Sequence, residues 1–122
     1  MEKKRSRFHH ILSFKHAFEG LLSALKEEPN LKFHFIFAVM VLSAAYYFQI
    51  TALDWIIIIV IISIVLALEL TNTAIEAIVD SFTIDQHPRA KYAKDIGAAA
   101  VLLSAIFASI VGIIIFWPYL FS

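Results

Sequence analysis

An uncharged apolar run from Trp55 to Leu68 leads directly into an acidic segment, and this junction most constrains what the chain can fold into. Four polar residues of the acidic segment share one face of a helix, because they lie 3, 4 and 4 residues apart: Glu69, Asn72, Glu76 and Asp80. Carboxylates and amides are costly at the end of a membrane-spanning helix, where they normally mark a functional site or an ion pathway. We therefore expect a cation-binding, chemically active helix face at the boundary between lipid and water.

The composition assigns the chain to the integral membrane proteins. It has 122 residues, enough for one domain, and 61% of them are hydrophobic, against roughly 45–50% in soluble domains. The absence of cysteine excludes disulfides, a thiolate nucleophile and cysteine-ligated zinc. The N-terminus is basic, as in a signal peptide, but charged residues interrupt the segment that would have to be apolar. We expect it to remain uncleaved.

The predicted fold is an all-α membrane protein with an amphipathic helix and three transmembrane helices. The amphipathic helix covers about residues 8–27 and either lies in the membrane interface or packs on the bundle. Pro29 ends or turns it. The spans cover about residues 33–53, 55–80 and 96–117, and since about 20 residues cross the hydrocarbon layer, the second must include part of the acidic segment.

Basic residues orient these spans. They precede the first span and lie between the second and third, whereas the turn between the first two has none. The positive-inside rule then places the N-terminus and the 81–95 loop in the cytoplasm. Helical rise puts Glu69 ~21 Å and Asp80 ~38 Å beyond Trp55. The acidic face thus runs from lipid depth into the compartment that holds ATP.

Small residues recur every four positions in the third span, at Ala100, Ser104, Ala108 and Gly112. Such a stripe allows helices to approach closely. We expect it to pack against other copies of the chain, and the alternative is packing against the chain's own helices.

Any nucleotide must be held without a glycine-rich loop, because the chain has only three glycines. Phosphates would then be bound through Mg²⁺, which is commonly held by one or two carboxylates plus phosphate oxygens. Glu28 and Glu76 are the candidate ligands. Lys94 can neutralise phosphate charge, and Asp95 can bind nucleotide or orient the lysine. The alternative is a snorkelling lysine beside a favourable helix N-terminal charge.

Glu69 is the deepest carboxylate and the candidate general base. A carboxylate removed from water holds a proton more readily, which suits a base that works near neutral pH. The histidines are not spaced like a zinc site. Among them, His16 and His87 are candidates for nucleotide contact. The basic N-terminus is expected to meet anionic lipid rather than nucleic acid.

Together these residues resemble the small prokaryotic diacylglycerol kinase family of integral membrane lipid kinases. The resemblance rests on three segments: Gly20-Leu with Glu28-Pro-Asn30, then 69–80, then 93–102. It implies a homotrimer with composite active sites at subunit interfaces, in a bacterial plasma membrane. The implied reaction transfers the γ-phosphate of ATP to a lipid alcohol, with Mg²⁺ as cofactor.

The resemblance also implies residue roles. Glu69 matches the family's base, Glu28 and Glu76 match its Mg²⁺ ligands, and we place Asn30, His34 and Glu69 at the lipid substrate. The implied nucleotide-binding positions are His16, Glu28, Asn72, Glu76, Asp80, Asp85, Gln86, His87, Lys94 and Asp95.

Two positions depart from the family pattern: His9 falls near an N-terminal arginine of relatives, and Lys32 stands where many have arginine. The pattern from Glu28 to His34 is similar to the Gram-positive branch, many of whose members prefer undecaprenol. We therefore expect an undecaprenol kinase, with diacylglycerol as the alternative acceptor. Non-enzymatic alternatives are a proton-coupled transporter that uses Glu69 and a membrane scaffold, which leaves the acidic face unexplained.

Overall fold

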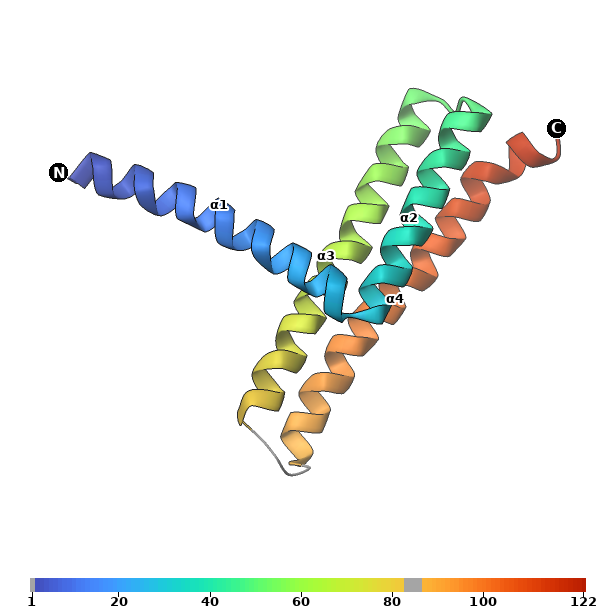
Figure 1. Cartoon of the computed structure of the whole chain (residues 1–122). Helices are drawn as coiled ribbons and strands as arrows, with labels where there is room; N and C mark the ends of the chain where they lie inside the picture. Colours follow the sequence, from blue (N-terminus) through green and yellow to red (C-terminus); the bar gives the residue numbers. More distant parts are fainter. Residues whose placement is uncertain (1, 83–86) are drawn as a thin grey trace.

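A computed structural model describes residues 2–82 and 87–122 of the chain, which form four helices and no strand. They are α1 (Glu2–Glu27), α2 (Pro29–Phe48), α3 (Ala52–Phe82) and α4 (Pro88–Leu120). The last three lie side by side, and α1 leaves them at a steep angle (Figure 1). Each of these three is long and apolar enough to cross a membrane. The predicted all-α membrane fold is therefore confirmed.

The first membrane helix is shifted toward the N-terminus relative to the predicted 33–53. It begins at Pro29, because proline is favoured in the first turn, where its missing N–H needs no partner. It ends at Phe48, and the capping residue Gln49 has a left-handed backbone conformation, with a φ of 51°. The N–H groups of Gln49 and Ile50 donate to carbonyls of the last turn, at 3.3 Å each. The turn therefore comes before Leu53, which belongs to α3.

The other two membrane helices are longer than predicted. Helix α3 runs unbroken for 31 residues and carries the whole acidic segment, as the length argument required. Helix α4 begins at Pro88 rather than near residue 96, because His87 caps it: the His87 Nδ1 accepts a hydrogen bond from the Arg89 N–H at 3.2 Å. It continues past Pro118 to Leu120.

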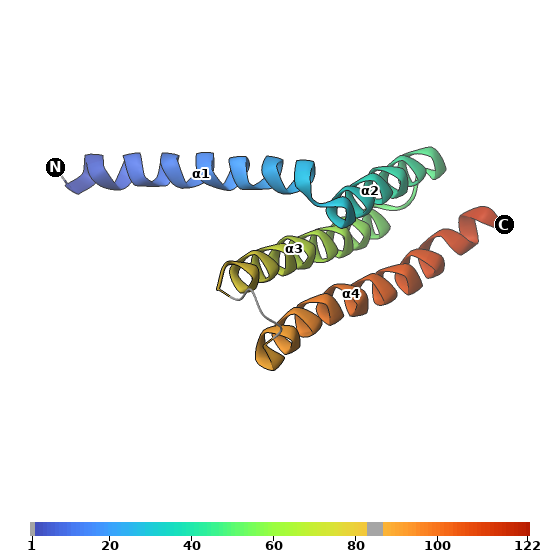
Figure 2. The same ribbon diagram turned by 60° about the horizontal axis from the view of Figure 1, so that its bottom comes forward.

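Helix α1 starts earlier than predicted, at Glu2, and only its C-terminal part approaches the bundle (Figure 2). Leu21 and Leu25 are half-buried there. Farther out, Phe14 and Phe18 are 79% and 63% exposed. Because Phe14 and Phe18 have no protein neighbours to cover them, α1 does not pack on the bundle over its whole length. This favours a position in the membrane interface.

Helix α3 is the centre of the fold, since it packs against both α2 and α4. Between α2 and α4 an apolar groove of about 990 Å³ remains open, and it extends from His34 to Phe121. Ala108 and Gly112 line this groove, and a Cβ added to Gly112 would meet nothing within 4 Å. This half of the small-residue stripe is therefore not covered by the chain's own helices.

A polar contact joins α3 to α4 at the end opposite the acidic segment. The Tyr119 hydroxyl donates to Asp54 Oδ2 at 3.0 Å and accepts from the Thr51 N–H at 3.2 Å. We predict that Tyr119→Phe lowers the free energy of unfolding by about 1 kcal/mol, the usual net value of one such bond. Thermal unfolding in detergent measures this. Tyr46→Phe, on a side chain 80% exposed, is the control and should unfold like wild type.

Candidate active site

Burial along the acidic face of α3 falls steadily toward the end of the helix. Glu69 is 4% exposed and Asn72 is 8% exposed, and they are the buried polar residues of the described chain. Glu76 is half-buried and Asp80 is exposed. The face thus leads from side chains shielded within the bundle to exposed ones.

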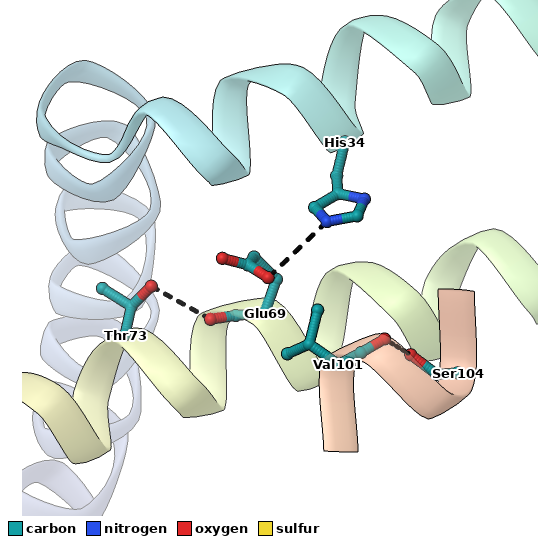
Figure 3. Close-up of polar contacts among 5 residues, drawn as sticks. All are labelled: His34, Glu69, Thr73, Val101 and Ser104. Atoms are coloured by element: carbon teal, nitrogen blue, oxygen red, sulfur yellow. Dashed lines mark hydrogen bonds and ion pairs between the residues drawn. The ribbon is translucent and has the colours of Figure 1, made fainter. Parts of the chain in front are cut away.

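The deepest carboxylate faces a histidine on the neighbouring helix. His34 points from α2 toward Glu69 on α3 (Figure 3), and its Nε2 lies 3.7 Å from Glu69 Oε2. The His34 side chain is 21% exposed and that of Glu69 is 5% exposed. The hydroxyl of Thr73 donates to the Glu69 backbone carbonyl at 3.0 Å, so it does not bind the carboxylate.

Asn72 on α3 lies against Gly97 on α4. A Cβ built on Gly97 would lie 2.3 Å from Asn72 Oδ1, a distance that real Cβ atoms do not adopt. Among the described residues, Oδ1 is a buried side-chain oxygen with no hydrogen-bond partner. A buried acceptor without a partner is costly. The residue is therefore kept there by something other than internal hydrogen bonding, which is typical of functional positions.

Lys94 on α4 is paired with a different residue from the Asp95 considered in the sequence analysis. Lys94 Nζ lies 2.9 Å from Asp80 Oδ1, and Lys94 also interacts electrostatically with Glu76 and Asp95. Asp95 itself pairs with Lys91 at 2.6 Å. The lysine is therefore oriented by Asp80 on the facing helix rather than by its sequence neighbour Asp95.

Two other carboxylates act electrostatically on Glu69. Glu28, half-buried at the break between α1 and α2, and Glu76 both lie close enough to Glu69 to interact with it electrostatically. Mutual repulsion makes such a group unfavourable without a cation. The shared Mg²⁺ site of Glu28 and Glu76 therefore stays a prediction.

The remaining predicted residues lie farther out. His16 is exposed on α1 and pairs with Glu19 at 3.6 Å, about 18 Å of helix away from Glu28, so a single chain does not bring it to the carboxylates. His87 is occupied as the cap of α4, and Asn30 is exposed in the first turn of α2. Asp85 and Gln86 lie outside the described residues.

Comparison with known proteins decides the family. The sequence model of the prokaryotic diacylglycerol kinases matches residues 15–116. This chain belongs to that family. It is 41% identical to an undecaprenol kinase of Bacillus subtilis over 108 residues, 88% of each chain. It is also 39% identical to a diacylglycerol kinase of Synechocystis, over 92% of this chain and 65% of that one. A diacylglycerol kinase of Haemophilus influenzae is 32% identical over 95% of this chain and all of that one.

As a member of this kinase family, the chain is a membrane lipid kinase that uses ATP. Carboxylate oxygens are the ligands that Mg²⁺ would take if it serves this reaction. The described residues contain no cluster of three or more His, Asp or Glu side chains arranged to hold a metal alone. Glu28 and Glu76 supply hard oxygen ligands of the right kind.

Sequence reasoning missed two contacts of this site. It placed His34 at the lipid substrate but did not pair it with Glu69, because that contact depends on how α2 crosses α3. It gave Gly97 no role. The available signal was a lone glycine in an apolar helix, which can mark a close approach to another side chain.

Proposed function

We propose that this enzyme phosphorylates undecaprenol, with Glu69 as general base and Mg²⁺ held by Glu28 and Glu76. The observation that carries the proposal is the buried Glu69 carboxylate, within electrostatic range of both other carboxylates. A base at lipid depth can meet the hydroxyl of a membrane alcohol, whereas the solvent side of the same helix face can meet ATP.

In the proposed reaction the lipid hydroxyl oxygen attacks the γ-phosphorus of ATP. A new bond forms between this oxygen and phosphorus, and the bond from phosphorus to the bridging oxygen breaks, so that ADP leaves with the electron pair. Glu69 takes the hydroxyl proton. A positioned general base of this kind contributes roughly 10²–10⁴ to the rate.

Phosphate binding falls to the more exposed groups. Bound Mg²⁺ would neutralise phosphate charge and favour the departure of ADP. Lys94, held by Asp80, provides a positive charge that acts on Glu76. Asn72 lies deeper on the same helix face; its Oδ1, which has no partner among the described residues, would accept from a donor of the nucleotide or bind Mg²⁺ rather than a phosphate oxygen. The other proposed nucleotide contacts are His16, Asp85, Gln86, His87 and Asp95.

The choice of undecaprenol rests on similarity. The Glu28 to His34 pattern and the Bacillus subtilis relative, which is named an undecaprenol kinase, both favour it. The open groove between α2 and α4 supports a long apolar acceptor, because its His34 end adjoins Glu69. His34 lines that end of the groove, and Asn30 is proposed to contact the acceptor as well. Diacylglycerol is the second candidate, because other relatives carry that name. Transport has no support from the family.

The proposal includes location and assembly. Basic residues favour a bacterial plasma membrane topology with the N-terminus in the cytoplasm. The family resemblance favours a homotrimer, in which a neighbouring copy would complete each site. In support, His16 lies far from the carboxylates of its own chain.

The acceptor assignment is tested by phosphoryl transfer in mixed micelles with ATP and Mg²⁺. We expect phosphate to appear on undecaprenol at a higher kcat/KM than on diacylglycerol, and the activity to disappear with a chelator. A preference for diacylglycerol would overturn the acceptor but leave the kinase in place. ATP hydrolysis that no lipid alcohol stimulates would contradict both.

A further inference from the structure

The Glu69 carboxylate is placed in unusual surroundings for an ionised group. It is nearly inaccessible to solvent, at 4% exposure, and the carboxylates within electrostatic range, Glu28 and Glu76, carry the same charge. Burying a charge among apolar groups and like charges is strongly unfavourable unless a partner compensates for it. A general base must nevertheless be ionised when its substrate arrives.

In the part of the chain that the structure describes, His34 is the candidate for this partner. Lys94 is engaged with Asp80, at 2.9 Å. The Thr73 hydroxyl donates to the backbone of Glu69 instead of its side chain. His34 is different, because its imidazole Nε2 points at the carboxylate at 3.7 Å (Figure 3). That separation is slightly too long for a hydrogen bond, and such contacts often tighten when substrate binds.

We propose that His34 is a positioning residue, which holds the Glu69 carboxylate ionised and aimed at the acceptor hydroxyl through its Nε2–H. This inference rests on the proposed role of Glu69 as base. It gives His34 a role in the chemical step that differs from lipid contact. The imidazole is suited to the task because it is half-buried, close to the carboxylate and itself at the end of the apolar groove.

Kinetics separate this role from lipid binding. We expect His34→Phe, which keeps a ring but loses the N–H, to lower kcat roughly ten- to a hundred-fold, a part of what a positioned base contributes. KM for the lipid and for MgATP should stay near the wild-type values. His34→Gln, which keeps an N–H donor, should retain more activity. Added imidazole should partly restore His34→Ala. The same changes at His10, exposed on α1, are matched controls and should have no effect.

An unchanged kcat in His34→Phe would overturn the inference. If the KM for lipid rises in the same variant, His34 is a plain substrate contact. A ¹⁵N NMR spectrum of the histidines gives a readout without turnover. Glu69→Gln should shift the His34 imidazole signals and leave those of His10 in place. Unmoved His34 signals would contradict the pairing even where a His34 variant fails to fold.

The experiment also distinguishes the inference from the proposed function on which it rests. If the Glu69→Gln enzyme is fully active, Glu69 is not the general base, and the proposed role of His34 is ruled out as well. If the Glu69→Gln enzyme is inactive but the His34→Phe enzyme is fully active, only the proposed role of His34 is ruled out.

Discussion

Glu69→Gln is expected to reduce phosphoryl transfer to the lipid by roughly 10²–10⁴, the usual contribution of a general base. The substitution keeps the size and shape of the side chain but removes its ability to accept the hydroxyl proton. Water cannot substitute for the lost base, because the side chain is buried and leaves little room for solvent. MgATP binding should persist, since the phosphates are expected at the more exposed Glu76, Lys94 and Asp80.

The measurement pairs transfer of radiolabelled phosphate to lipid with the affinity for MgATP. Glu27→Gln is the matched control: it makes the same chemical change on an exposed side chain at the end of α1 and should behave like wild type. A Glu69→Gln enzyme with wild-type turnover would show that the hydroxyl proton goes elsewhere. Loss of nucleotide binding together with turnover would instead assign Glu69 to the nucleotide site.

Much of this fold follows from sequence, because the periodicity of polar and apolar residues reports directly on helix faces. The spacing of Glu69, Asn72, Glu76 and Asp80 predicted a common face, and these four residues do grade from buried to exposed along α3. The need for about 20 residues per span placed the acidic segment inside the second crossing. Such local rules are independent of how the helices pack.

Helix ends and contacts between helices were harder to predict. The first span was drawn to Leu53 because Asp54 is the next charge, whereas the left-handed Gln49 ends α2 before that. Asp95 was expected either to bind nucleotide or to orient Lys94, but the crossing of α3 and α4 brings Lys94 to Asp80. Pairings of this kind depend on tertiary geometry, which residue spacing does not encode.

Gly97→Ala is expected to lower activity on the order of 10²-fold, the cost of a misplaced active-site group, without unfolding the protein. The added Cβ would lie 2.3 Å from Asn72 Oδ1. The side-chain amide can rotate away, because the clash is with the end of a side chain rather than with backbone. The helices therefore stay packed, and the change falls on the position of Asn72.

Two comparisons isolate this effect. Gly20→Ala makes the same change in α1, where a Cβ meets nothing within 4 Å. It should keep activity and gain up to about 1 kcal/mol of helix stability, since alanine is a better helix former than glycine.

Asn72→Ala and the double variant Gly97→Ala/Asn72→Ala should have equal activities, because Gly97 acts only through the Asn72 side chain. A further drop in the double variant would mean that Gly97 sets the distance between α3 and α4 instead. Wild-type activity in Gly97→Ala would show that the position of the Asn72 amide does not matter for catalysis.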